Sequence, residues 1–237
     1  MNDNTILYDF DTIQSRLLCG ARVSSLLPAF ERIAQGSAQK PKETVVASPD
    51  FLSKNEELLK YHTVFQKNFG TFLNHGCASI PFLLEELIRV GIAINKMAME
   101  RKTPLYYYET SSADGTVART LAEYGMGKIH TLTDSPNEAN QTEFYRLLNH
   151  KYSFFHRGCF AEITPLFISK KYPLFANGFD IIWENTTFQL YGNYRQEQIA
   201  YVKRLLAKNG IMIFLEKMLH QNNTEYLRRE TLKEEKF

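Results

Sequence analysis

The stretch "YYYETSSADGTVARTLAEYG", residues 106–125, decides the fold of this 237-residue chain. An aromatic run typical of a buried strand meets an acid, Glu109, and a run that reads as a helix follows. Small residues stand between them at every second position: Ser111, Ala113 and Gly115. Small side chains let a backbone turn tightly and approach a ligand closely. The stretch therefore predicts a strand, a tight turn and a helix, and the turn is either a ligand-binding loop or an ordinary connection.

Short apolar runs and helical stretches continue to alternate after this segment. Strands are predicted over residues 104–110, 128–134, 152–158, 179–185 and 211–218, and helices over residues 116–125, 135–150 and 194–210. Strands that alternate with helices predict an α/β fold with a doubly wound, mostly parallel, Rossmann-like sheet. Ligands of such sheets bind at the carboxyl ends of the strands, where the strand order reverses. The strand ends are therefore the places to examine.

The first hundred residues have a different, mainly helical pattern. Residues 78–102 carry apolar side chains at helical spacing and end in basic residues, which suit a helix C-terminus. Residues 34–50 contain Gly, Ser, Pro and Lys with poor periodicity, so they read as a loop or an arm. We expect residues 1–102 to form a helical extension or lid, and residues 103–237 to form the α/β domain.

The second predicted strand ends in Asp134, about 19 residues after Gly115. In nucleotide-binding sheets an acid at this place accepts hydrogen bonds from the two ribose hydroxyls. Asp134 or Ser135, just before Pro136, would also make a good helix N-cap. Both interpretations stay open, because the cap and a ribose ligand occupy the same place in the topology.

Further polar groups follow the third and fourth predicted strands. Cys159 and Phe160 follow the third, and Glu184 and Asn185 end the fourth. A ligand site at the strand ends needs polar groups there. The alternative for Glu184 and Asn185 is an ordinary polar loop.

Taken in order and spacing, these strand ends resemble a class I S-adenosylmethionine-dependent methyltransferase over roughly residues 103–218. The family's acid-x-Gly-x-Gly-x-Gly motif would be "ETSSADG", residues 109–115, and "LTDSP" is similar to its D-x-S-P, with the acid one residue nearer the proline. "VKRLLAKNGIMIFLEKM" resembles the last helix, turn and fifth strand. The resemblance implies S-adenosylmethionine as cofactor, bound by Glu109, Thr110, Ser111, Ser112, Ala113, Gly115, Asp134, Ser135, Cys159, Phe160, Glu184 and Asn185.

The chain departs from the family pattern in several places. Two of the three loop glycines are replaced, and Cys159 stands where the family has an adenine-binding Asp. Asn209 replaces the first glycine of the turn before the fifth strand, although Asn tolerates a left-handed backbone. The family sheet continues with an antiparallel hairpin, whereas residues 219–237 read as polar and helical. We expect the C-terminal strands to be missing or abbreviated, or further domains to follow in a longer chain.

By resemblance, the reaction is transfer of a methyl group from a sulfonium to a nucleophile, for which the protein mainly positions the reactants. Glu184, Asn185, Tyr191 and Tyr194 are candidates near the acceptor, and no catalytic residue is assigned. The helical extension and the aromatic-rich composition favour a small-molecule acceptor, such as a natural product. A protein or RNA acceptor is the second choice.

Two other classes of function stay open. The altered glycine motif is also consistent with a degenerate cofactor fold that serves as a scaffold or partner-binding module without catalysis. A dinucleotide oxidoreductase shares the fold and the acid, but it needs a second mononucleotide-binding half, for which the helical N-terminal third offers no strands.

Composition excludes several classes of protein. The formal net charge of +2 does not favour nucleic acid, and no run approaches 18 apolar residues, so no membrane span is expected. The three cysteines, Cys19, Cys77 and Cys159, are far apart, which argues against disulfides and a structural zinc. The N-terminus does not read as a secretory signal. We expect a cytoplasmic protein without a bound metal.

Overall fold

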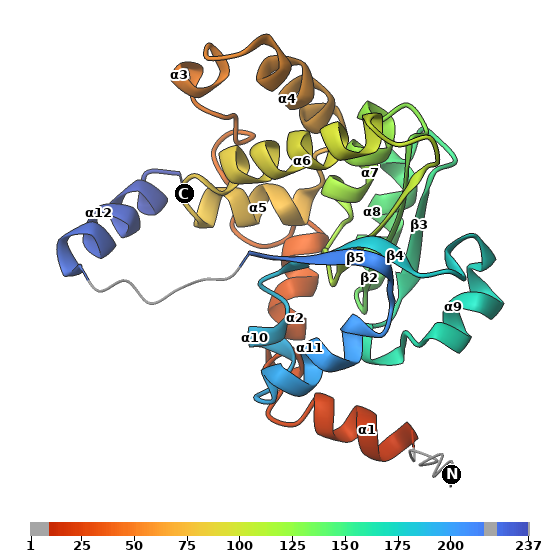
Figure 1. Ribbon diagram of the computed structural model, residues 1–237. Helices are drawn as coiled ribbons and strands as arrows, with labels where there is room; N and C mark the ends of the chain where they lie inside the picture. Colours follow the sequence, from red (N-terminus) through yellow and green to blue (C-terminus); the bar gives the residue numbers. More distant parts are fainter. Residues whose placement is uncertain (1–9, 216–221, 237) are drawn as a thin grey trace, which may run out of the picture.

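The computed structural model describes residues 10–215 and 222–236 (Figure 1). Its sheet has five strands, all parallel, in the order β3-β2-β1-β4-β5. This confirms the predicted Rossmann-like α/β fold. The expected strand residues 216–218 lie outside the described part. The strands are β1 (Leu105–Thr110), β2 (Ile129–Ser135), β3 (Ser153–Arg157), β4 (Phe179–Asn185) and β5 (Leu206–Leu215).

The strand order places a reversal beside β1. From β1 the chain steps outward to β2 and β3, and it then returns to the other side of β1 as β4 and β5. In the register, Glu109 of β1 lies opposite Thr133 of β2 and Trp183 of β4, and Thr110 lies opposite Glu184. The carboxyl ends of β1 and β4 therefore form the switch point, which is where ligands of open α/β sheets bind.

Helices cover both faces of the sheet (Figure 1). Those that follow β1 to β4 are α7 (Thr116–Tyr124), α8 (Glu138–Leu147), α9 (Pro165–Lys171), α10 (Phe188–Tyr191) and α11 (Arg195–Lys203), with two 3-10 turns, η1 (Phe160–Glu162) and η2 (Pro173–Phe175). The N-terminal part is helical, as predicted, with α1 (Phe10–Leu17), α2 (Val23–Ala34), α3 (Pro49–Leu52), α4 (Glu56–Asn68), α5 (Thr71–Ser79) and α6 (Leu83–Met99). A last helix, α12 (Asn223–Glu234), follows β5.

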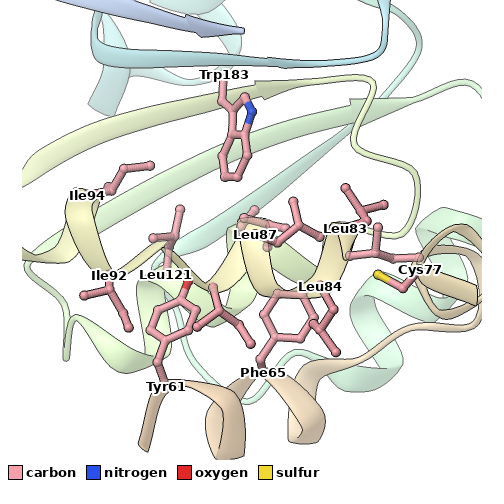
Figure 2. Close-up of a cluster of buried hydrophobic side chains, with 14 of the residues drawn as sticks. Tyr61, Phe65, Cys77, Leu83, Leu84, Leu87, Ile92, Ile94, Leu121 and Trp183 are labelled. Atoms are coloured by element: carbon pink, nitrogen blue, oxygen red, sulfur yellow. The ribbon is translucent and has the colours of Figure 1, made fainter. Parts of the chain in front are cut away.

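The aromatic run of β1 is explained by burial on both faces. Side chains alternate along a strand, so Tyr107 and Tyr108 enter different cores, and both are fully buried. Tyr107 packs in a cluster with Trp183 and with Leu87 of α6, and Figure 2 shows Trp183 pointing toward Leu87. Tyr108 packs on the opposite face, in a cluster that includes residues of α9, α10 and α11. The N-terminal helices thus share one core with the sheet.

The predicted boundary between the last helix of the sheet domain and the fifth strand is wrong. The helix expected over residues 194–210 ends at Lys203, and β5 begins at Leu206. Phe179 of β4 pairs with Leu206, and its backbone N–H donates to the Leu205 carbonyl at 2.8 Å. These hydrogen bonds hold residues 205 and 206 against β4, so the helix cannot continue through them. Asn209 has a left-handed backbone, φ +65°, as expected, but it lies inside the strand where the register shifts.

Within residues 10–215 and 222–236, none of the helices combines the length and apolar character needed to cross a membrane.

Candidate functional site

The loop between β1 and α7 has a left-handed backbone at alternate residues. The φ angles are +48° at Ser111, +58° at Ala113 and +71° at Gly115. A left-handed residue with a Cβ costs roughly 1–2 kcal/mol, which is why glycine usually occupies such positions. The chain keeps the spacing of the glycine motif because the backbone keeps its shape, and Ser111 and Ala113 adopt that shape at an energetic cost.

Asp134 secures the first part of this loop. Its Oδ1 accepts hydrogen bonds from the Ser111 backbone N–H at 3.0 Å and from the Tyr108 hydroxyl at 2.7 Å, and its Oδ2 accepts from Ser111 Oγ at 3.2 Å. Asp134 is fully buried, and this burial raises its pKa to about 6, while the hydrogen bonds from Ser111 and Tyr108 oppose the rise. The carboxylate that sequence predicts as a ribose ligand therefore already accepts hydrogen bonds from Tyr108 and Ser111 of the same chain.

The displacement of this acid by one residue has a structural consequence. Thr133 stands where the D-x-S-P pattern has its acid, and its hydroxyl donates to the Glu109 carbonyl at 3.2 Å. Neighbouring Thr131 faces α7 and donates to the Ala118 carbonyl at 3.3 Å. Because side chains alternate along a strand, Asp134 points to the opposite face, where Tyr108 lies. The shift by one position moves the carboxylate across the sheet.

The prediction that Asp134 or Ser135 caps the next helix is wrong. β2 continues to Ser135, and the N-cap of α8 is Asn137, whose Oδ1 accepts from the backbone N–H groups of Ala139 and Asn140 at 2.8 and 3.4 Å. Ser135 Oγ accepts from the Asn137 backbone N–H at 3.3 Å and from Asn140 Nδ2 at 3.1 Å. Ser135 thus supports the start of α8 from the preceding strand.

Glu109 lies at the switch point, at the end of β1. It is almost completely buried, and its Oε2 has no hydrogen-bond partner among the described residues. Burial raises its pKa to about 8, and nearby Asp114 adds to the rise, whereas a hydrogen bond from Asn185 opposes it. At neutral pH the side chain therefore favours its protonated form, and a cation bound beside it would lower its pKa and favour the carboxylate.

The residues after β4 form a closed turn. Glu184 Oε1 accepts hydrogen bonds from the backbone N–H groups of Thr187 and Phe188, the latter at 2.9 Å, so it initiates α10. Tyr191 of α10 is buried and hydrogen bonds to Ser111. Tyr194 is 44% exposed and lies under Arg16 instead. Of the two tyrosines predicted near the acceptor, the structure brings only Tyr191 to the strand ends.

Cys159 and Phe160 follow β3, beside the same cluster. The ring of Phe160 contacts that of Tyr191, with 5.6 Å between centroids. Burial, reinforced by the charge of Asp134, raises the pKa of Cys159 to about 12, so the thiol stays protonated at neutral pH. Its backbone N–H donates to Glu162 Oε1 at 3.1 Å. Neither residue supplies an anionic group in place of the adenine-binding Asp of the family.

Gly115 is required by packing. A Cβ at this position would lie 2.5 Å from Cδ2 of the Phe144 ring, on α8. The glycine therefore lets α8 approach the loop, in addition to providing a left-handed turn into α7.

Sequence reasoning missed two groups of residues. Asp114, Thr116 and Arg119 are fully buried beside the loop, and an acid two residues before the predicted helix was a signal for Asp114. The second group belongs to a segment, residues 14–22, that crosses α10, α11 and η1. Gln14 Nε2 donates to the Ala161 carbonyl at 3.2 Å, and the Leu17 carbonyl accepts from Gln198 Nε2 at 2.7 Å.

Two adjoining cavities lie beside the strand ends, and neither is lined by any residue predicted to bind the cofactor. The first, of 380 Å³, lies between α2 and α8 and is lined by Glu31, Ala34, Gln35, Asn137, Glu138, Ala139, Thr142 and Glu143. The second, also 380 Å³, adjoins it at Glu143 and includes residues 38–44 and the start of α5. In the part of the chain that the structure describes, no three His, Cys, Asp or Glu side chains are arranged to hold a metal ion.

Comparison with known proteins gives similar structures only. No family model and no curated protein matches the chain. Several of the solved structures that this chain resembles are described as methyltransferases. A SAM-dependent methyltransferase from Thiobacillus denitrificans, in complex with S-adenosyl-L-homocysteine, is 14% identical, with a TM-score of 0.44 over 63% of this chain and 57% of that one. One from Geobacter sulfurreducens, also with S-adenosyl-L-homocysteine, is 12% identical, with a TM-score of 0.39 over 79% and 54%.

A third similar structure is the plantazolicin methyltransferase BpumL in complex with a monoazolic desmethylPZN analog and SAH. It is 8% identical, with a TM-score of 0.47 over 96% of this chain and 70% of that one. This chain spans little more than half the length of the first two proteins.

The residues present fit S-adenosylmethionine at the end of β1, but at the end of β2 Asp134 lies on the face of the sheet opposite to Thr133 and Glu109. At β1, Glu109 has an unpaired oxygen, and Ser111 and Ala113 are partly exposed. At β2, Asp134 has the right chemistry to accept from ribose hydroxyls, but Ser111 and Tyr108 must first release its carboxylate.

Proposed function

We propose that this chain is an S-adenosylmethionine-dependent methyltransferase. The observation that carries the proposal is the left-handed loop of residues 111–115 at the switch point, with carboxylates at the ends of both β1 and β2. A loop of this shape lets the backbone approach a ligand, and the two acids supply acceptors for an ammonium group and for hydroxyls.

Each residue of the site has a binding role in this proposal. Glu109 would accept from the ammonium group of the cofactor, Asp134 from its ribose hydroxyls, and the backbone of residues 111–115 would line its path. The bound cofactor supplies an electrophilic methyl group on a sulfonium. The buried rings of Tyr191 and Phe160 exclude water from that region, and in-line transfer needs little beyond such positioning. No side chain is assigned as a base, because one is needed only if the acceptor must lose a proton.

We propose a small molecule as the methyl acceptor. The segment of residues 14–22 and α10 cover the strand ends, which favours a confined space over an open groove for a macromolecule. A natural product is our specific expectation, and a protein or RNA acceptor is the alternative. Incubation with isotopically labelled S-adenosylmethionine and either a metabolite extract or cellular protein and RNA distinguishes them by the fraction that acquires the label.

Binding of the cofactor is the first test. Isothermal titration with S-adenosylmethionine and S-adenosylhomocysteine is expected to show saturable binding, and a nicotinamide dinucleotide is expected to show none. Asp134→Ala should weaken binding by roughly 1–3 kcal/mol, the scale of hydrogen bonds to a charged group. Absence of binding by the folded wild-type protein contradicts the proposal.

A second candidate function is favoured by one observation. Asp134 is fully buried and already accepts three hydrogen bonds from the protein, which is expected of a fold that no longer binds a cofactor. In that case the chain would be a scaffold or partner-binding module without catalysis. The same titration separates the two functions, since a module of this kind binds neither sulfur compound.

A further inference from the structure

The turn between α4 and α5 lies directly on the loop that follows β1. The backbone N–H of Gly70 donates to Thr116 Oγ1 at 2.9 Å, and the backbone N–H of Leu73 donates to Asp114 Oδ2 at 2.8 Å. Both bonds are buried. They connect residues more than 40 positions apart in the sequence, so they join the helical N-terminal part to the sheet.

Asp114 is the centre of this contact. Its Oδ2 accepts from the backbone N–H of Leu73, in the first turn of α5. Its Oδ1 accepts from the backbone N–H of Thr116 at 3.1 Å and from the Thr116 hydroxyl at 2.6 Å. The N-cap position of α5 is Gly70, which has no side chain to accept these N–H groups. One buried carboxylate therefore caps two helices at once, and its charge is favourable at both N-termini.

Arg119 adds a second connection between the same two segments. Its Nη1 donates to the Asp114 carbonyl, and its Nη2 donates to the Asn68 carbonyl at 2.8 Å. Arg119 is fully buried, and burial lowers its pKa, while the charge of Asp114 opposes this change. Since two opposite charges lie together behind the loop, each compensates part of the cost of burying the other.

The fit leaves no room for change at Gly70. A Cβ there would collide with the carboxylate group of Asp114. The start of α5 therefore approaches the loop as closely as a glycine permits.

The loop needs such external contacts. Ser111 and Ala113 hold left-handed angles that side chains disfavour, and such strain persists only where the surroundings impose it. Asp134 holds the loop at Ser111. Asp114 lies between the left-handed residues Ala113 and Gly115 and is the contact at the other end.

We propose that Asp114 is a positioning residue of the strand-end site, which fixes the course of residues 111–115 by tying them to the start of α5. The turn between α4 and α5 is then a component of the cofactor site rather than part of a detachable lid. The effect on the cofactor rests on the proposed function, whereas the effect on the loop does not.

Hydrogen exchange without ligand tests the positioning itself. Asp114→Asn keeps the size of the side chain, but its amide group cannot accept from both helix starts. We expect exchange at least tenfold faster than in the wild type in two segments together, residues 109–120 and 69–76. The matched control is Asp180→Asn. Asp180 accepts from the Tyr106 backbone N–H at 2.9 Å and pairs with Arg101 at the opposite end of the sheet, so this variant should leave both segments unchanged.

Titration with S-adenosylhomocysteine tests the consequence for the site. Both variants are expected to lower the melting temperature, but only Asp114→Asn should weaken binding, by at least tenfold. A purely structural role for Asp114 would lower the melting temperature without changing the affinity of the folded protein. Circular dichroism confirms that each variant is folded under the titration conditions.

Each possible result either supports or overturns the proposed role of Asp114. Unchanged exchange of residues 109–115 in folded Asp114→Asn overturns the proposal, and so does unchanged affinity where the wild type binds. If the wild type binds no S-adenosylhomocysteine, the proposed function fails, and the exchange data alone decide whether Asp114 positions the loop. If Asp114→Asn does not fold, Thr116→Val serves instead. It has nearly the same shape and removes the hydroxyl that joins Gly70 to Asp114, so a smaller change in the same direction is expected.

Discussion

The methyl side chain of Ala113, in the loop after β1, destabilises the folded protein by an amount that can be measured. Ala113 holds φ +58° and makes no side-chain hydrogen bond that would offset the strain. Replacement by glycine removes roughly 1–2 kcal/mol of strain and adds about 0.5–1 kcal/mol of entropy to the unfolded chain. We expect Ala113→Gly to raise the free energy of unfolding by up to about 1 kcal/mol in urea. Ala122→Gly in the middle of α7 should lower it by at least about 1 kcal/mol. A loss of the same size in both variants would show that Ala113 is not left-handed.

Glu109 makes stability depend on pH. Its pKa rises from 4.5 to about 8 on folding, so the folded protein holds a proton that the unfolded chain releases in this range. The stabilisation is complete below pH 4.5 and is lost as the pH rises through 8, on the order of 5 kcal/mol. Glu109→Gln cannot lose this proton. Urea unfolding at pH 5, 6.5 and 8 should therefore show a steeper fall for the wild type than for Glu109→Gln.

Two comparisons isolate that effect. Asp134, with a pKa raised to about 6, also loses its stabilisation as the pH rises, but it does so in both proteins and cancels in the difference. The exposed Glu43 provides the control, since Glu43→Gln should follow the wild-type profile. Parallel profiles for wild type and Glu109→Gln would mean that Glu109 is already ionised in the folded protein at pH 5.

At the residue scale, sequence predicted the position of the candidate residues at the strand ends but not the contacts of their side chains. Asp134 was identified from its place at the end of β2, which chain order alone supplies. Its partners Tyr108 and Ser111 depend on which face of β2 it occupies, and a shift of one residue reverses that face. Asp114 was missed because its partner Leu73 lies on a helix whose position only the folded chain defines.

At the element scale, the junction of the β1 loop with α7 depends on Gly115. A Cβ would meet the Phe144 ring at 2.5 Å, and φ is +71°, so both space and conformation oppose any larger residue. We expect Gly115→Ala to lower the free energy of unfolding by roughly 2–4 kcal/mol. Gly76 in α5 has open space around its Cβ position, and Gly76→Ala should raise stability by up to about 1 kcal/mol. Equal effects of the two changes in urea unfolding would contradict the packing described here.

The elements themselves were largely predictable. The runs that became β1 and β4 are mostly apolar, as strands buried on both faces tend to be, and α7 between the strands has an apolar face. The runs that became β2 and β3 contain fewer apolar residues but alternate with helical stretches. The end of α11 was not predictable, because residues 204–208 suit a helix by local propensity, whereas Leu206 pairs with Phe179 of β4 and begins β5. Tertiary hydrogen bonds overrode the local preference there.

At the scale of the whole molecule, the helical N-terminal part and the sheet share a core. Leu87 of α6, Phe65 of α4 and Trp183 of β4 pack in one buried cluster (Figure 2). Tyr107 of β1 belongs to the same cluster. Composition predicted such a helical part but gave no information about which face of the sheet it would cover. Whether residues 1–102 and 103–237 are separate domains is a question about cooperativity, and the shared core favours one unfolding unit.

Trp183 allows a direct test of that cooperativity. It is the only tryptophan of the sequence and is fully buried between the sheet and α6, so its fluorescence reports on the shared core. Far-ultraviolet circular dichroism reports mainly on the helices. We expect both signals to give the same urea midpoint, as in a two-state transition. Leu87→Ala should lower the free energy of unfolding by about 2–5 kcal/mol and shift both urea midpoints equally. Leu132→Ala, on the opposite face of the sheet, should have the same effect. If Leu87→Ala shifted the dichroism alone, the division at residue 102 would mark two domains that unfold independently.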